Sequence, residues 1–363
     1  MAVIYGDDLA NDLSGTAGAD TIYGLGGDDT LRSQSGDALY GGVGDDVYFV
    51  GSNRDLLQSI ASVREDVNQG HDSVYWSAGG ATKTVIYHLP PNVEDLYVLG
   101  SVIDIVYGND GDNLIDVSGV YDVPGSYVSS VKGGLGDDVI FGGDSFDTLD
   151  GGEGEDGMAG GKGDDEYFVD NVNDIVVENS GGGRDYVFST ANGYRLASNV
   201  EDMCLAGDGR QVVAYGNALD NDIRSEGDHS RVINAGRGND YIESYGNAAD
   251  VYNGGAGNDT LKAGLGDDVY RTSGAFGRDE ITDTGGDDAV EFDVNESTLW
   301  FSKNGNDLNV SVIGTQNGVT VKNWYSDSSA KIEEFYAGTG KMLTAAKVDT
   351  LVTAMSAFAQ PTT

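Results

Sequence analysis

Cysteine, basic side chains and long apolar runs are all scarce in this chain. Cys204 is the one cysteine among 363 residues, which excludes a disulfide framework and a cysteine-based metal site. Lys and Arg number 20 against 61 Asp and Glu, so we expect no basic patch for nucleic acid or an anionic membrane. No apolar run approaches the ~20 residues of a membrane span. The opening residues MAVIYGDDLAND lack the basic and apolar regions of a secretory leader, so none is expected.

The composition is strongly acidic. The formal net charge is −41, and hydrophobic residues make up 39% of the chain. Such a charge repels itself in any compact state, and a chain of this hydrophobicity orders poorly unless the charge is neutralised. We therefore expect divalent cations as partners. A halophile-type acidic surface would also explain the charge, but not the period described next.

Glycine is abundant, with 56 copies, and its spacing is regular between Gly133 and Phe168. This stretch reads GGLGDDVIF, GGDSFDTLD, GGEGEDGMA and GGKGDDEYF, which are four nine-residue units without a gap. Each unit has Asp at its sixth place and an apolar residue at its eighth. A fixed short period predicts a solenoid.

The residue types explain what such a unit does. Glycines at places one, two and four allow positive φ and a tight turn that points carbonyl oxygens inward. Carbonyl and carboxylate oxygens are the ligands that calcium prefers. The last three residues, such as Val139-Ile140-Phe141, predict a short strand whose middle side chain faces the interior. Two units make one coil, so strands should stack in parallel at every second unit.

The units carry the G-G-x-G-x-D-x-U-x pattern, where U is a large apolar residue, and this pattern is the known signature of RTX repeats. The sequence closely resembles the RTX (haemolysin-type calcium-binding nonapeptide repeat) family. The resemblance implies an all-β fold, a parallel β-roll or β-solenoid with calcium-binding turns, and calcium ions as cofactors. On the order of ten ions would offset about half of the formal charge. It also implies type I secretion machinery as a partner and an uncleaved C-terminal secretion signal.

The repeats fall into tandem blocks. We predict block one at residues 1–55, block two at 108–174 and block three at 216–271, separated by β-strand segments at 56–107 and 175–215. The two separating segments match each other, since Asn92-Val93-Glu94-Asp95 corresponds to Asn199-Val200-Glu201-Asp202. We expect them to widen the same solenoid instead of forming separate domains.

Residues 272–363 differ from the rest. Asn304-Gly305 between two apolar segments predicts a hairpin, and Asn317-Gly318 leads into a further strand. Val348, Leu351, Val352 and Met355 are spaced for an amphipathic helix. The prediction is a small antiparallel β cap with a C-terminal helix, because a solenoid end must be covered. The resemblance places the secretion signal at about residues 332–363.

The family's coordination pattern implies the calcium ligands. One turn offers the backbone oxygens of places two and four with its Asp at place six, and the turn two units later offers those of places one and three with its own Asp. The residues so implied are Asp20, Leu25, Gly27, Asp29, Gly41, Val43, Asp46, Asp55, Gly134, Gly136, Asp138, Gly143, Ser145, Asp147, Gly151, Gly152, Glu153, Gly154, Asp156, Gly160, Lys162, Asp165, Asn171, Asp174, Gly236, Gly238, Asp240, Asp250, Gly254, Ala256, Asp259 and Asp268.

Some units depart from the pattern. The shortened unit at residues 33–40 places Ala38 where Asp belongs, which weakens the case for an ion there. Asn11 and Asn221 replace Asp and should weaken their sites, because a neutral oxygen gains less from a cation.

No catalytic signature is present: G-x-S-x-G, H-E-x-x-H and the P-loop are all missing. Repeats begin near residue 6 and leave no room for a catalytic domain ahead of them, so we expect a non-enzyme. The predicted function is a secreted calcium-binding protein that folds outside the cell and self-assembles as a surface-layer, filament, matrix or adhesive protein. A calcium-dependent carbohydrate-binding or bacteriocin-like module, with surface glycans as partners, is the alternative. A polysaccharide-modifying enzyme is a third. The 20 tyrosines serve either lateral contacts or a narrow core.

Overall fold

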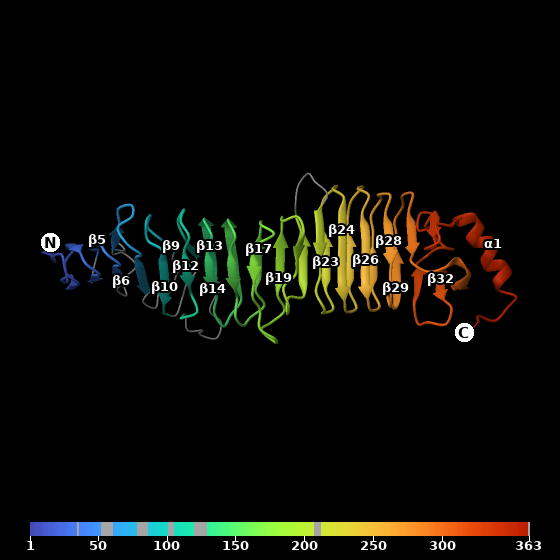
Figure 1. The fold of residues 1–363 in the computed structure, drawn as a ribbon, viewed down its shortest axis with the longest axis horizontal. Coiled ribbons are helices and arrows are strands. Elements are labelled where there is room, and N and C mark those ends of the chain that lie inside the picture. Colours follow the sequence, from blue (N-terminus) through green and yellow to red (C-terminus); the bar gives the residue numbers. More distant parts are fainter. Residues whose placement is uncertain are drawn as a thin grey trace. The chain divides into compact units, whose positions relative to one another are not determined.

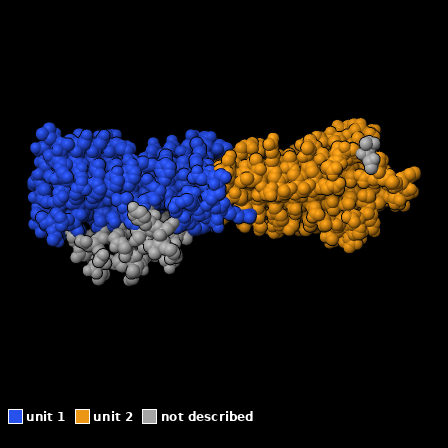
Figure 2. All heavy atoms as spheres, turned by 90° about the horizontal axis from the view of Figure 1, so that it is seen from below, with its two compact units in different colours: residues 1–185 blue, residues 186–363 orange. Residues whose placement is uncertain are grey.

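The computed structural model describes residues 1–34, 36–51, 61–77, 86–100, 105–119, 129–206 and 212–361. These residues form two compact units, Met1–Asp185 and Tyr186–Thr363, which Figure 2 distinguishes by colour. In each unit the dominant element is a short β-strand that is followed, one coil later, by another strand of the same sheet (Figure 1). The predicted all-β parallel solenoid is confirmed.

Unit 1 builds its sheets from alternate strands. The sheet orders are β1-β3-β5-β7, β2-β4-β6-β8-β10-β12-β14-β16-β18 and β9-β11-β13-β15-β17. The strands are β1 (Val3–Tyr5), β2 (Asp12–Ser14), β3 (Thr21–Gly26), β4 (Thr30–Arg32), β5 (Ala38–Val43), β6 (Val47–Gly51), β7 (Ser62–Arg64), β8 (Ser73–Ser77), β9 (Ile86–His88), β10 (Asp95–Leu99), β11 (Ile105–Tyr107), β12 (Leu114–Asp116), β13 (Ser129–Leu135), β14 (Val139–Phe141), β15 (Asp147–Glu153), β16 (Gly157–Ala159), β17 (Glu166–Val169) and β18 (Ile175–Val176).

The register confirms that two nonapeptide units make one coil. Strand β13 pairs with β15 in parallel, with Ser129 opposite Asp147, a shift of 18 residues. Strands β8 and β10, from the predicted segment between blocks one and two, pair in parallel with each other and with β6 and β12. That segment therefore belongs to the same solenoid, as predicted.

The core of the solenoid is a column of place-eight side chains. Ile22, Leu31, Ile140 and Leu149 are all fully buried between the sheets. Each buried Leu or Ile contributes roughly 1.5–3 kcal/mol through removal of its apolar surface from water. The predicted inward direction of the middle strand residue is confirmed, because side chains of a strand alternate between its two faces.

Unit 2 has the same architecture and ends in antiparallel strands. Its sheet orders are β19-β21-β23-β25-β27-β29-β33-β32-β31 and β20-β22-β24-β26-β28-β30-β34-β35. The elements are β19 (Tyr186–Ser189), β20 (Tyr194–Arg195), β21 (Asp202–Leu205), β22 (Val212–Tyr215), β23 (Asp222–Ser225), β24 (Arg231–Arg237), β25 (Tyr241–Ser244), β26 (Val251–Ala256), β27 (Thr260–Lys262), β28 (Val269–Thr272), β29 (Arg278–Thr282), β30 (Ala289–Phe292), η1 (Glu296–Thr298), β31 (Leu299–Asn304), β32 (Asp307–Val312), β33 (Gly318–Val321), β34 (Glu334–Tyr336), β35 (Met342–Thr344) and α1 (Ala345–Met355).

The end of unit 2 has the predicted cap. Strands β31 and β32 form an antiparallel hairpin whose turn contains Gly305 at φ +59°, and β33 pairs antiparallel with β32. Helix α1 buries Val348 and Val352 and contacts β31 and β35. The parallel pairing itself runs further than the repeats indicate, since β29 and β30 pair in parallel with β33 and β34. The six predicted segment boundaries stay a prediction.

Candidate metal centres

The place-six aspartates form hydrogen-bonded ladders along the turns. The backbone N–H of Asp138 donates to Oδ1 of Asp156 over 2.8 Å, and that of Asp147 donates to Oδ1 of Asp165 over 2.8 Å. The same bond links successive members of the ladders Asn11–Asp29–Asp46–Asp72, Asp20–Asp37, Asn113–Asp138–Asp156–Asp174 and Asp147–Asp165–Asp185 in unit 1, and Asn221–Asp240–Asp259–Asp279 and Asp250–Asp268–Asp288 in unit 2. Each turn thus carries a carboxylate that is fixed by the preceding turn.

The second carboxylate oxygen of many ladder members has no hydrogen-bond partner. Among the described residues, this holds for Oδ2 of Asp29, Asp46, Asp138, Asp156, Asp165, Asp240, Asp259, Asp268 and Asp288, all of them buried. A buried polar atom without a partner costs ~1–3 kcal/mol, and more when it is charged. Recurrence of this feature at one repeat position points to a ligand that supplies the missing interaction.

Backbone carbonyl oxygens face the same spaces between successive turns as the unpartnered Oδ2 atoms. A methyl group on Gly133 would lie 2.1 Å from Oδ2 of Asp138 and 2.4 Å from the carbonyl oxygen of Gly151 one coil later. A methyl group on Gly152 would lie 2.1 Å from the carbonyl oxygen of Gly134. Place-one carbonyls therefore point back along the solenoid and place-two carbonyls point forward, so each Asp is flanked by oxygens from two turns. All of these donors are oxygens, which fits calcium.

Burial keeps these carboxyls partly protonated in the absence of a cation. Desolvation, with a smaller effect of neighbouring carboxylates, raises the pKa of Asp138 to about 7 and the pKa of Asp165 to about 8. The same cause raises the pKa of Asp240 to about 7 and the pKa of Asp268 to about 8. A cation between the turns would replace these protons and neutralise the buried charge.

The implied backbone ligands that the structure describes lie in the turns between strands or at the strand ends next to them. Gly41, Gly160 and Gly254 each lie against Oδ2 of the Asp in their own unit, as Gly133 does. Leu25 takes φ +87° at place two, where the four regular units of block two have glycine, and its carbonyl oxygen faces Gly42 of the next coil. The remaining members, Gly27, Val43, Gly136, Gly143, Ser145, Gly151, Glu153, Gly154, Lys162, Gly236, Gly238 and Ala256, lie in the same turns. Their role as calcium ligands stays a prediction. Asp55 lies outside the described residues.

The assignment of Ala38 to place six is wrong. Ala38 pairs with Thr21, a place-seven residue, and Oδ1 of Asp37 accepts the backbone N–H of Asp20 over 2.7 Å. Leu39 is buried at place eight and holds the register of its strand. The residue that the shortened unit lacks is therefore missing from the turn before Asp37. Asp37 therefore belongs to the ladder that Asp20 begins.

Several ladder residues escaped the sequence analysis. Asp72, Asp185, Asp279 and Asp288 accept the backbone N–H of the repeat Asp one coil earlier, which is Asp46, Asp165, Asp259 and Asp268 respectively. They lie in segments without the full nonapeptide. A Gly two residues ahead of Asp72 and of Asp185 was the available signal. The glycines, Gly70 and Gly183, lie against place-four carbonyls of the preceding coil.

Some predicted sites have internal partners for their oxygens. Both oxygens of Asp20 accept hydrogen bonds, since Oδ2 accepts from the N–H and hydroxyl of Thr16. The side-chain amide of Asn171 donates to the carbonyl oxygen of Gly154 over 2.5 Å, and Oδ2 of Asp174 accepts the N–H groups of Asp170 and Asn171. These contacts compete with a cation.

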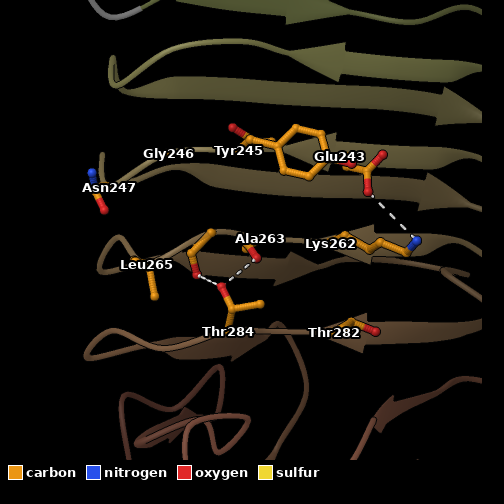
Figure 3. Close-up of a pocket in the computed structure, with 11 residues that line it drawn as sticks. Glu243, Tyr245, Gly246, Asn247, Lys262, Ala263, Leu265, Thr282 and Thr284 are labelled. Carbon is orange, nitrogen blue, oxygen red and sulfur yellow. Dashed lines mark hydrogen bonds and ion pairs between the residues drawn. The ribbon is translucent and has the colours of Figure 1, made fainter.

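A separate hollow lies on unit 2 beside Tyr245 and Leu265 (Figure 3). Its one carboxylate, Glu243, lies 3.8 Å from the ammonium of Lys262. The hydroxyl of Thr284 donates to the carbonyl oxygens of Ala263 and Gly264. Because Glu243 is the one acid among the described residues that line it, this hollow presents no pair of catalytic carboxylates.

The turn geometry predicts a specific effect of a methyl group. In Gly151→Ala, the new methyl would lie 2.2 Å from Oδ2 of Asp156, inside the space between turns. We expect the variant to bind fewer calcium ions and to require more calcium to fold. At 100 times the dissociation constant, loss of one site removes about 2.7 kcal/mol of stabilisation. Gly157→Ala is the matched control, because its methyl meets nothing closer than 3.9 Å. Calcium titrations followed by circular dichroism compare the calcium concentrations at which the two variants fold. Equal midpoints for Gly151→Ala and Gly157→Ala would contradict a calcium site at this turn.

The stacked turns, buried carboxylate ladders and facing carbonyls define a calcium-binding β-solenoid. Comparison with known families agrees: the model of the RTX calcium-binding nonapeptide repeat matches residues 5–38, 36–57, 132–167 and 244–274. The model of the haemolysin-type calcium binding protein related domain matches residues 307–336, which include β32, β33 and β34. The chain carries RTX calcium-binding nonapeptide repeats.

A curated relative shares part of this sequence. The plasmid haemolysin of Escherichia coli is 34% identical over 98 residues, which cover 23% of this chain and 10% of that protein. The chain thus matches about a tenth of the length of that relative. RTX haemolysin-like proteins are typically secreted. Among the described residues, no helix has both the length and the apolar character needed to cross a bilayer.

Proposed function

We propose that this chain is exported by type I secretion machinery and folds outside the cell when calcium binds between its turns. The observation that supports this most directly is the recurrent buried Asp Oδ2 without a partner among the described residues, flanked by carbonyl oxygens. Extracellular calcium modules bind at ~10⁻⁴–10⁻³ M. Below that concentration the acidic chain repels itself and stays extended; above it, bound ions stabilise the folded form by mass action.

We further propose a structural role through self-association. Strands β1 and β2 are edge strands of their sheets, and exposed strand edges pair readily with other chains. Val3 and Tyr5 on β1 are 58% and 64% exposed. The rings of Tyr5, Tyr23 and Tyr40 stack at 5.2 and 4.8 Å along one face, whereas Tyr48, Tyr167 and Tyr270 fill the core. Tyrosines therefore lie both in the core and along an outer face, where Tyr5 is available for contacts between molecules.

Sedimentation velocity in a few millimolar calcium tests the assembly. We expect species larger than the 38.0 kDa monomer, and we expect the double variant Val3→Glu/Tyr5→Glu to remain monomeric, because added charge on an edge strand blocks pairing. Val172→Glu, at a turn residue that is 50% exposed, is the matched control. A compact wild-type monomer at every concentration would refute assembly and favour the carbohydrate-binding or effector module.

A further inference from the structure

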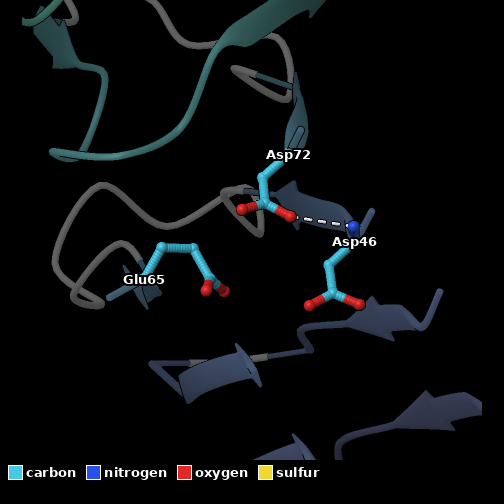
Figure 4. A group of neighbouring side chains, drawn as sticks. All are labelled: Asp46, Glu65 and Asp72. Atoms are coloured by element: carbon cyan, nitrogen blue, oxygen red, sulfur yellow. Dashed lines mark hydrogen bonds between the residues drawn. The ribbon is translucent and has the colours of Figure 1, made fainter. Parts of the chain in front are cut away.

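Each repeat block ends at a cluster of three carboxylates. Among the described residues these clusters are Asp46, Glu65 and Asp72; Asp165, Glu178 and Asp185; and Asp268, Asp283 and Asp288, each with ligand oxygens within 4.8 Å of one another. In every case the first member is the place-six Asp of the block's last unit, and the last member is the next Asp along the ladder. Figure 4 shows the first cluster, with the three side chains converging.

The middle acid of each cluster takes the position that glycine holds in most other turns. Strand β7 pairs with β5 up to Tyr40 and Arg64, so the next residue, Glu65, stands opposite Gly41 at place one. By the same count, Glu178 stands opposite Gly160 and Asp283 stands opposite Ala263. Place one elsewhere contributes only a neutral carbonyl oxygen. At the block ends a carboxylate is available at that place.

A tyrosine accompanies each cluster. The final unit of every block contains the sequence GDD-x-Tyr, with Tyr48, Tyr167 and Tyr270 at place eight. The hydroxyl of Tyr167 donates to Glu178, and that of Tyr270 donates to Oδ2 of Asp283 over 2.6 Å. In the second and third clusters the tyrosine on the core side therefore holds the middle acid in place.

The clusters contain buried polar atoms without a partner. Glu65 is 9% exposed and Asp46 is fully buried, yet Oε2 of Glu65 and Oδ2 of Asp46 lack a hydrogen-bond partner among the described residues, as does the hydroxyl of Tyr48. In the third cluster, Oδ2 of Asp268 and of Asp288 are in the same situation, and both residues are at most 1% exposed. Three acids that converge with free buried oxygens point to a bound cation.

Blocks two and three begin in the opposite way. Asn113 and Asn221 occupy place six of the first unit, and each donates its side-chain amide to a backbone carbonyl, of Val93 and Val200 respectively, over 3.3 Å. At these two turns the side-chain amide donates to a carbonyl oxygen that faces the turn, so the oxygen has a partner without a cation. The first unit of these two blocks therefore lacks the place-six carboxylate that their last unit carries.

We propose that each block closes on a three-carboxylate calcium site that binds the ion more tightly than the two-carboxylate sites inside the block. The inference rests on the proposed calcium function and deepens it. A third carboxylate adds a full negative charge where interior sites have a carbonyl dipole, and the ligand charge count is a principal determinant of calcium affinity. These three sites are expected to fill first as the calcium concentration rises.

Equilibrium dialysis of the full chain against calcium tests this inference. The wild type is expected to bind a tight class of three ions and a weaker class. Glu65→Gln keeps the shape and the hydrogen bond from the Gly41 N–H to Oε1 but removes the charge. It should reduce the number of tightly bound ions from three to two, because the affinity of the first cluster for its ion should fall by roughly tenfold or more. The control is Asp66→Asn, which makes the same charge change at an exposed neighbour and should leave three tightly bound ions.

Asp283→Asn, with the exposed Glu280→Gln as its control, repeats the test in unit 2, so a folding defect in one variant does not decide the outcome. If Glu65→Gln and Asp283→Asn both keep three tight ions, the inference is overturned, and the middle acids serve as neutral hydrogen-bond partners. A wild type that binds no calcium in the millimolar range would refute the proposed function itself. The two failures are therefore distinguishable.

Discussion

Removal of calcium at neutral pH is expected to convert the compact β-structure into an extended chain. With calcium at 100 times its dissociation constant, each site stabilises the folded chain by about 2.7 kcal/mol. A handful of such sites equals the ~5–15 kcal/mol net stability of a whole domain. The formal charge of −41 and the buried ladder carboxylates both oppose folding once the ions leave. Loss of calcium therefore removes more free energy than the remaining contacts supply.

The measurement is far-ultraviolet circular dichroism together with sedimentation velocity, in EDTA and then in excess calcium. The β signal and the sedimentation coefficient should both fall in EDTA and both recover when calcium is restored. Magnesium at the same concentration is the control, because it demands a smaller octahedral site and gives up its waters reluctantly. An unchanged, compact protein in EDTA at pH 7.5 would mean that the solenoid is stable without ions.

The calcium-free chain is expected to fold better in mild acid than at alkaline pH. Burial raises the pKa of Asp46 to about 7, of Asp165 to about 8 and of Asp279 to about 8, whereas an unfolded Asp titrates near ~3.9. Between these values the folded chain binds more protons than the unfolded chain, so its stability decreases as the pH rises. The stabilisation is complete below about pH 4 and is lost on passing through pH 6–8.

Urea titrations in EDTA at pH 5 and at pH 8.5 measure this effect: an unfolding transition is expected at pH 5, whereas at pH 8.5 the chain should be extended before urea is added. In excess calcium the sign should reverse, because protons then compete with calcium for the same carboxylates. Equal midpoints in EDTA at the two pH values would contradict the burial of the ladder carboxyls in the calcium-free fold.

Much of the site could be anticipated from local chemistry. The nine-residue spacing brings Asp138 and Asp156 one coil apart, and the apolar Ile140 and Leu149 must face inward, since alternate residues of a strand point to opposite faces. The Asn304-Gly305 turn fixed the hairpin of β31 and β32 in the same local way. These features depend on residues that are neighbours in sequence or at a constant period.

Other features depended on contacts across longer and irregular separations. Asp37 and not Ala38 joins the ladder, because parallel pairing of β5 with β3 and burial of Leu39 set the register of the shortened unit. Asp72 reaches Asp46 across 26 residues, and the extra acid Glu65 stands beside Gly41 across 24. No period in the sequence links these residues, since the intervening lengths vary from block to block.

By itself, the sequence of this protein determined a parallel solenoid with two nonapeptide units in each coil, an inward apolar column and a place-six carboxylate in each regular turn. The reason is that glycine spacing and strand alternation act within a few residues. Only the tertiary structure decided where each ladder continues beyond the repeats and which acids converge at the end of a block. Those contacts arise from the register between coils, and that register is set by packing of the whole sheet and not by any local pattern.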